Sequence, residues 1–181
     1  LDALLEQGSS ARLLYGVPNF QNPSGVSYSR ANREALAERL VRHDLLMVED
    51  DPYGELRFEG EHLPPIAKLA PNNTVLLGSF SKTVVPAFRL GWMLVPDWLR
   101  KKVTIAKQAT DLHSNAFSQQ VLHRFLIDNS LDAHLEKIKE VYGRQRAAME
   151  AALARHCPPG VSYTRPEGGM FLWLTLPASI S

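Results

Sequence analysis

One lysine in this chain has neighbours that suit covalent chemistry. Lys82 follows the apolar run Val75-Leu76-Leu77, with Ser79 and Ser81 just before it and Arg89 shortly after it. Hydroxyls and a guanidinium are good donors to a phosphate. A lysine amine attacks an aldehyde to form a Schiff base. The stretch therefore predicts a carbonyl cofactor that carries a phosphate, although a lysine just beyond a strand is most often a solvated loop cation.

Two other loops supply groups that complement this amine. Asn22 follows the apolar run 13–17, and Asp50 follows the run 45–48, with Tyr53 three residues later. The spacings from Asn22 to Asp50 and from Asp50 to Lys82 each match one βαβ unit, which takes ~30 residues. Loops that follow successive parallel strands emerge at the carboxyl edge of the sheet, where α/β proteins bind their ligands. We therefore expect one site to collect all three loops.

The combined chemistry points to pyridoxal phosphate (PLP). An amide can donate to an oxyanion, a carboxylate can hold a protonated ring nitrogen, and the nitrogen must stay protonated for carbanion chemistry on that ring. Each residue also has a structural alternative. Asn22 before a proline would suit a turn cap, Asp50 a helix or turn cap, Tyr53 a packing role, and Arg89 a surface ion pair.

The surrounding elements predict an α/β fold with a mostly parallel sheet. Strands at 13–17, 45–48 and 74–78 are separated by an amphipathic helix from Ser29 to His43 and by a short helix at 66–70. The apolar face of the first helix should carry Leu36, Ala37, Leu40 and Val41. The linker to the next strand, 90–95, is too short for a parallel crossover, so that strand should be antiparallel.

The second half of the chain predicts helices and then a small α+β unit. Helices are expected from Asp97, as N-cap, to about Thr110, at Ala116 to Asp128, and at Leu131 to His156, with strands at Val161 to Arg165 and Met170 to Leu176. We interpret residues 1–130 as part of a PLP-binding large domain, 131–156 as a long connecting helix, and 157–181 as the beginning of a small C-terminal domain. Neither end looks like a natural terminus, so we expect a longer protein.

Composition fits one ordinary globular core. The 181 residues are 45% hydrophobic and 22% charged, with a net charge of +1, which argues against a dedicated nucleic-acid surface. Cys157 is the only cysteine, so no internal disulfide forms, and the six histidines show no metal-ligand spacing. No apolar run approaches a membrane span. We expect a cytoplasmic protein without a metal.

At these residues the chain resembles the class I/II aminotransferases of PLP fold type I. The matching motifs are Asn22-Pro23-Ser24-Gly25, Asp50-Asp51-Pro52-Tyr53, Ser79-Phe80-Ser81-Lys82 and Arg89-Leu90-Gly91. The segments Glu49 to Tyr53 and Gly168 to Trp173 look most like the branch that contains 2-aminoadipate and kynurenine aminotransferases and the aminotransferase-like half of MocR regulators.

The resemblance implies a role for each site residue. It implies that Lys82 carries the internal aldimine, Asp50 pairs with the pyridine nitrogen, Asn22 and Tyr53 contact the ring phenolate, Ser79, Ser81 and Arg89 hold phosphate, and Gly168 and Gly169 lie near the substrate. The family's N-terminal glycine-rich phosphate loop, its ring-stacking aromatic residue and its C-terminal substrate arginine have no counterpart here. They would lie before Leu1 and after Ser181.

The expected activity is transamination between an amino acid and a 2-oxo acid, in a protein of amino acid metabolism that forms a homodimer. Three alternatives stay open at this point. The chain would also suit a PLP-dependent C-S lyase, the PLP-sensing domain of a MocR/GntR-type transcriptional regulator with a DNA-binding domain upstream, or an idle fragment that folds without a complete site.

Overall fold

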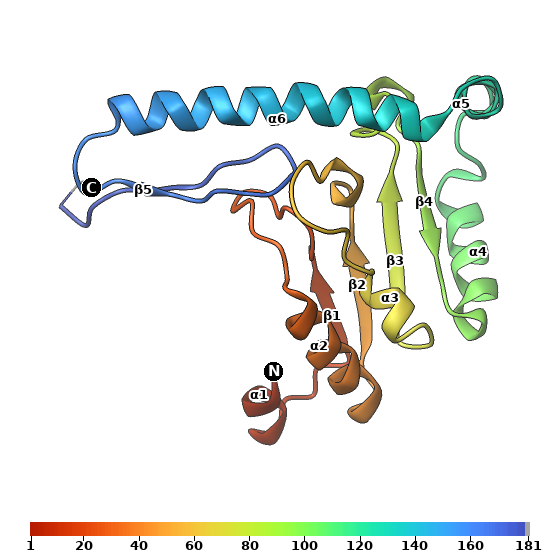
Figure 1. Ribbon diagram of the computed structural model, residues 1–181. Helices are drawn as coiled ribbons and strands as arrows, with labels where there is room; N and C mark the ends of the chain where they lie inside the picture. Colours follow the sequence, from red (N-terminus) through yellow and green to blue (C-terminus); the bar gives the residue numbers. More distant parts are fainter. Residues whose placement is uncertain (180–181) are drawn as a thin grey trace.

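The chain folds around a four-stranded mixed sheet (Figure 1). The computed structural model describes residues 1–179. The strands are β1 (Leu13–Gly16), β2 (Leu46–Asp50), β3 (Thr74–Ser79) and β4 (Gly91–Leu94), in the order β1-β2-β3-β4. The first three are parallel and β4 pairs antiparallel to β3, which confirms the predicted fold class and the predicted direction of the last strand.

Helices and a small hairpin complete the described part of the chain. The helices are α1 (Asp2–Glu6), α2 (Arg30–Arg42), α3 (Ile66–Leu69), α4 (Asp97–Asp111), α5 (Ala116–Asp128) and α6 (Leu131–His156), with 3-10 turns η1 (Gly54–Leu56) and η2 (Pro86–Phe88). The strands β5 (Ser162–Tyr163) and β6 (Leu174–Thr175) pair antiparallel. These two strands are much shorter than the sequence predicts. The helix at 131–156 matches the predicted connecting helix, while the division into domains stays a prediction.

Two helices, α2 and α3, cover one face of the sheet. A buried cluster of Ala37, Leu40, Leu45, Met47, Ile66 and Ala70 fills the space between them and β2. The Ser29 hydroxyl caps α2 by accepting from the Asn32 amide at 3.2 Å. The buried stripe of α2 runs through Arg33, Ala37 and Leu40, whereas Val41 is 61% exposed. Val41, which the sequence placed on the apolar face, therefore lies outside the buried stripe, and Arg33 occupies that stripe in the first turn instead.

A buried carboxylate joins the sheet to α3. Glu49 of β2 accepts hydrogen bonds from the amides of Ile66 and Ala67, at 2.9 and 2.8 Å. These amides belong to the first turn of α3, whose N–H groups have no partner within the helix. Burial raises the pKa of Glu49, and the two amide hydrogen bonds oppose that rise. Glu49 thus acts as the anchor for the start of α3.

The long helix α6 crosses above the carboxyl ends of the parallel strands (Figure 1). Its residues Ile138 and Tyr142 pack on a second buried cluster, formed by Phe20, Tyr53 and Leu56. The prediction of an N-cap at the start of α4 was wrong. Pro96 occupies the cap position without a side-chain hydrogen bond, and Asp97 is the first helical residue, where its charge complements the helix dipole.

Candidate functional site

The carboxylate predicted to hold a ring nitrogen lies at the end of β2. Asp50 is the last residue of that strand, and its Oδ2 accepts a hydrogen bond of 2.6 Å from the Tyr15 hydroxyl. Tyr15 pairs with Val48 in the parallel register, and Asp50 lies two residues after Val48 on the same strand. The side chains of Tyr15 and Asp50 therefore project from the same face of the sheet, the face opposite α2. This hydrogen bond raises the pKa of the Tyr15 phenol. The contact fixes one carboxylate oxygen of Asp50, and among the described residues neither oxygen accepts from a backbone amide, so Asp50 does not cap a turn.

The loop after β1 carries Asn22 and is organised by its neighbour. The Gln21 side chain accepts from the Ser24 amide and hydroxyl, at 3.0 and 2.6 Å, and donates to the Asn22 carbonyl at 2.5 Å. Gln21 therefore caps the turn, a role that the sequence had also offered to Asn22. Within residues 1–179, the Asn22 amide group makes no hydrogen bond and is exposed, so it is available to a ligand.

The lysine loop leaves β3 as a tight turn. The Ser79 hydroxyl accepts from the Ser81 amide at 3.1 Å, and the Thr83 hydroxyl donates to the Ser79 carbonyl at 3.3 Å. Lys82 is half-buried in this turn, and within residues 1–179 it forms no ion pair. The predicted cofactor role and the alternative of a solvated loop cation therefore both stay predictions.

Arg89 returns the chain to the lysine turn. The amide of Phe80 donates to the carbonyl of Leu90 at 3.1 Å, and Ser79 pairs with Gly91, so Arg89 lies beside the serines of the turn. Its backbone is left-handed, with φ 53° and ψ 39°, which is uncommon for a bulky residue and often marks a functional position. No ion pair of Arg89 occurs among the described residues, so the predicted alternative of a surface ion pair is not what the structure has.

Tyr53 belongs to the buried cluster that joins the site loops. It is 7% exposed, and its ring meets the Phe171 ring edge-on, with centroids 5.5 Å apart. The residue thus packs, as its structural alternative predicts, while its place three residues after Asp50 keeps the predicted cofactor role open. Phe20 lies in the same cluster and belongs to the loop of Asn22.

Gly168 and Gly169 are buried against Phe20. A Cβ at Gly168 would lie 2.3 Å from Phe20 Cζ and 2.5 Å from the Leu56 carbonyl oxygen. Gly169 has φ +75°, and its amide donates to that same carbonyl at 2.9 Å. Close packing therefore requires glycine at both positions, and their predicted closeness to a substrate stays a prediction.

The sheet register brings three of the predicted groups to neighbouring strand ends. Asp50 pairs with Leu77, and Ser79 lies two residues after Leu77 on the same strand. The side chains of Asp50 and Ser79 therefore lie on the same face of the sheet, the face opposite α2. The Lys82 turn follows directly. Phe20, two residues before Asn22, packs with Tyr53, three residues after Asp50, and the position of the Asn22 side chain relative to Asp50 and Lys82 stays a prediction.

Tyr15 is a site residue that sequence reasoning missed. It stands within a predicted strand, seven positions before Asn22, and reads as an ordinary strand aromatic. The only available signal was register. A parallel pairing of 13–17 with the strand before Asp50 puts alternate residues of both strands on one face.

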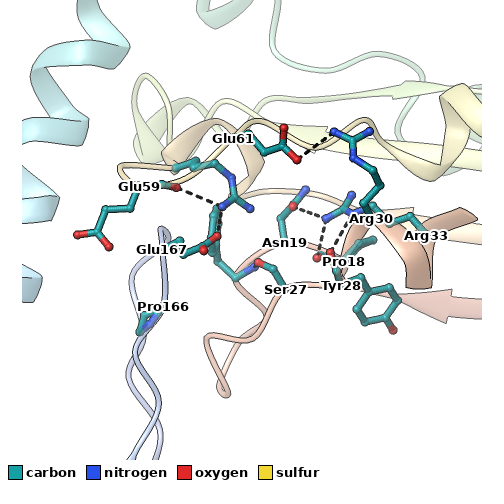
Figure 2. Close-up of polar contacts among 12 residues, drawn as sticks. Pro18, Asn19, Ser27, Tyr28, Arg30, Arg33, Glu59, Glu61, Pro166 and Glu167 are labelled. Carbon is teal, nitrogen blue, oxygen red and sulfur yellow. Dashed lines mark hydrogen bonds and ion pairs between the residues drawn. The ribbon is translucent and has the colours of Figure 1, made fainter.

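A hollow of about 680 Å³ lies between the start of α2 and the loop 164–167, and Asn22, Asp50 and Lys82 are not among its lining residues; Figure 2 shows several of its charged groups. Its charged groups largely satisfy one another. Arg30 pairs with Glu61 at 3.2 Å, and Arg57 pairs with Glu167 and also donates to the Glu59 carbonyl. Arg57 further stacks on the Phe20 ring, 4.9 Å from its centroid. This hollow is therefore a seam between the loops, not the predicted site.

Comparison with known proteins identifies the protein family. Residues 1–180 match the family described as aminotransferase class I and II. The chain belongs to this family. Aromatic-amino-acid aminotransferase 1 of Thermococcus litoralis is 42% identical to this aminotransferase-family chain over 181 residues, which is 99% of the chain and 43% of that enzyme.

A solved structure and a regulator extend the comparison. The crystal structure of Pyrococcus horikoshii kynurenine aminotransferase, in complex with PMP, superimposes with a TM-score of 0.93 at 43% identity, over 99% of this aminotransferase-family chain and 45% of that one. The uncharacterised HTH-type transcriptional regulator YdfD of Bacillus subtilis is 32% identical over 98% of the chain and 37% of the regulator. The aminotransferase-family chain thus spans less than half the length of these relatives.

The donor set of the aminotransferase-family chain fits the cofactor of its family. Asp50 keeps Oδ1 free of hydrogen bonds within residues 1–179 while Tyr15 holds Oδ2, which suits a charge-assisted bond to a protonated ring nitrogen. The hydroxyls of Ser79 and Ser81, with the guanidinium of Arg89, offer donors of the kind that bind phosphate. Among residues 1–179, no group of three or more His, Cys, Asp or Glu side chains could hold a metal ion, and no helix is long and apolar enough to cross a membrane.

Proposed function

We propose that the full-length protein is a PLP-dependent aminotransferase that transfers an amino group between an amino acid and a 2-oxo acid. The observation that carries this proposal is the strand-end arrangement. A carboxylate fixed by Tyr15 ends β2, and the turn with Ser79, Ser81 and Lys82 begins beside it at the end of β3. The names of the relatives support an amino acid with a large side chain as the donor.

The residues of this chain would hold the cofactor at both ends. Asp50 would keep a proton on the ring nitrogen, and Asn22 and Tyr53 would donate to the ring oxygen. Ser79, Ser81 and Arg89 would bind the phosphate. When bound, PLP supplies an aldehyde and an electron-withdrawing ring that stabilises negative charge on the α-carbon of an amino acid.

Lys82 would have two tasks in the reaction. Its amine would bond the aldehyde of the cofactor and so hold the cofactor in place. The same amine would act as the base that takes the proton from the α-carbon of a bound amino acid and later gives it back. Half-burial in a tight turn limits the positions that the amine can reach, and a positioned base typically contributes ~10²–10⁴-fold to the rate.

The proposal is tested with the full-length protein and the Lys82→Ala variant. The unmodified protein should show a PLP absorbance band that persists after dialysis, and it should form a new amino acid when given an aromatic amino acid and a 2-oxo acid. Lys82→Ala should lose the stable band and the transfer. Lys68→Ala is the matched control, because Lys68 is an exposed lysine of α3 on the opposite face of the sheet. An unmodified protein that binds no PLP would contradict the proposal.

A second candidate is a transcriptional regulator that senses PLP. The observation in its favour is the similarity to an HTH-type regulator over nearly the whole chain. This reading expects a DNA-binding domain elsewhere in the full-length protein and a DNA affinity that changes with PLP. Fluorescence anisotropy with DNA from the protein's own promoter, with and without PLP, separates the two candidates. Transfer of amino groups without DNA binding favours the enzyme.

A homodimer in the cytoplasm completes the proposal and rests on the family resemblance. Light scattering on the full-length protein should give twice the mass of one chain. Fractionation of the source cells should recover it with cytoplasmic enzymes. A monomer that transfers amino groups would contradict the first of these statements and leave the activity untouched.

A further inference from the structure

A charged side chain that no predicted role uses lies under the site loops. Arg33 of α2 is 0% exposed, and its guanidinium donates to the carbonyls of Tyr28, Pro64 and Pro18, at 3.1, 3.2 and 3.0 Å (Figure 2). Burial lowers the pKa of Arg33, so the fold bears a desolvation cost at this position. The hydrogen bonds that Arg33 donates offset part of this cost.

The fourth contact of Arg33 leads towards the cofactor site. Its Nη2 donates to Asn19 Oδ1 at 2.6 Å, and Asn19 Nδ2 donates to Asp51 Oδ2 at 2.9 Å. The orientation of the Asn19 amide is unambiguous, because arginine can only donate and an ionised carboxylate can only accept. The amide therefore bridges the buried guanidinium of Arg33 and the half-buried carboxylate of Asp51.

The far end of this bridge adjoins the residue that would hold the ring nitrogen. Asp51 directly follows Asp50, and its carboxylate packs so closely on Gly54 that a Cβ there would lie 2.3 Å from Oδ2. The Asp51 amide donates to the Leu77 carbonyl at 2.9 Å, which ties it to β3. At the other end, Asn19 lies three residues before Asn22 in the loop after β1.

We propose that Arg33, Asn19 and Asp51 form a buried relay that fixes the loop of Asn22 relative to the loop of Asp50, and thereby positions the two sides of the cofactor ring. The relay rests on the proposed function only where it refers to the cofactor. These three are positioning residues, since they act through Asn22 and Asp50.

The chemistry of the bridge allows a selective test with Asn19→Asp in the full-length protein. The new carboxylate keeps one oxygen that accepts from Arg33. Its other oxygen replaces the NH₂ group that donates to Asp51 in the wild type. Two ionised carboxylates at that distance repel each other, whereas a shared proton restores a hydrogen bond. Among the other charged groups around Asp51, Arg33 lowers its pKa and Glu55 raises it, while Asp51 in turn raises the pKa of the buried Glu49. The variant should therefore have an intact relay at low pH and a broken one at high pH.

Two measurements report on the relay. In PLP-free protein, hydrogen–deuterium exchange should show normal protection of residues 20–25 in Asn19→Asp at pH 5.5 and reduced protection at pH 8.5. In PLP titrations, the ratio of the Kd of the variant to the Kd of the wild type should rise about tenfold between pH 5.5 and pH 8.5. A tenfold change is what results when the repulsion between the two carboxylates shifts a pKa by about one unit. Asn19→Leu, which breaks both hydrogen bonds, should show both defects at every pH.

Asn73→Asp provides the matched control. Asn73 donates to the Leu45 carbonyl at 3.0 Å and so ties loops together far from Asp50. This variant should lose stability without any pH-dependent change in the Kd ratio or in the protection of residues 20–25. If Asn19→Asp behaves in the same way as this control, the relay is refuted. A failure of wild-type protein to bind PLP would overturn the proposed function, while the exchange data on PLP-free protein would still decide the relay.

Discussion

Replacement of Gly168 by alanine tests whether its loop is packed as closely as the structure indicates. The new methyl group would lie 2.3 Å from Phe20 Cζ and 2.5 Å from the Leu56 carbonyl oxygen, far inside contact distance. Neither neighbour can yield easily. The Phe20 ring is 1% exposed with Arg57 stacked on it, and the Leu56 carbonyl already accepts from the Gly169 amide.

The expected cost follows from this rigidity. Overpacking a well-packed core by one methyl group costs about 1–3 kcal/mol, and occasionally more. Since both contacts are with buried groups that are held from another side, we expect Gly168→Ala to lower the free energy of unfolding by about 3 kcal/mol. To relieve the clash, Gly168 would have to move away from Leu56. That movement would also weaken the antiparallel β-bridge that pairs the backbones of Arg57 and Gly168.

A second glycine supplies a control, because its replacement by alanine should raise the free energy of unfolding instead of lowering it. Gly143 lies within α6, and a Cβ there would meet Phe58 at 3.6 Å, an ordinary contact. Alanine is favoured over glycine in a helix interior by roughly 0.5–1 kcal/mol, so Gly143→Ala should stabilise the protein. Urea unfolding of the full-length protein without ligands, followed by tryptophan fluorescence, measures both. Equal stability of Gly168→Ala and wild type would refute the packing described here.

Two further changes address the site and the core. Tyr15→Phe should weaken PLP binding about fivefold in an equilibrium titration, because it removes a hydrogen bond from Asp50 that is worth about 1 kcal/mol in a partly solvated setting; an unchanged Kd would show that Asp50 needs no such support. Burial raises the pKa of Glu49 above its unfolded value, so its contribution to stability is fully present at acid pH and is lost as pH rises through the folded pKa. The difference in unfolding free energy between wild type and Glu49→Gln should therefore shrink from acid to neutral pH, and a difference that grows would have the wrong sign.

Sequence reasoning located the strands and the loops that follow them because each signal was local. Apolar runs ended by turn residues predicted β1, β2 and β3, and a short linker decided the direction of β4. The loop positions of Asn22, Asp50 and Lys82 followed from this order. Their roles in the chemistry depend on a cofactor and stay predictions.

The residues that sequence reasoning missed act through contacts between distant segments. Arg33 was not singled out in the sequence, although its spacing of four from Ala37 places it on the buried stripe. Asn19 and Asp51 are ordinary loop residues until the folded chain brings them together at 2.9 Å. A cap at Asp97 was expected from residue type alone, whereas the backbone begins that helix one residue earlier.

The two outer strands of the sheet have a practical consequence for protein production. Within residues 1–179, β1 and β4 each have a neighbour on one side only, and both carry large apolar side chains in contact with solvent, such as Leu13 and Leu94. Strands of this kind join readily to strands of other molecules. A recombinant polypeptide limited to these 181 residues should therefore collect in inclusion bodies, and expression trials are better begun from the whole reading frame.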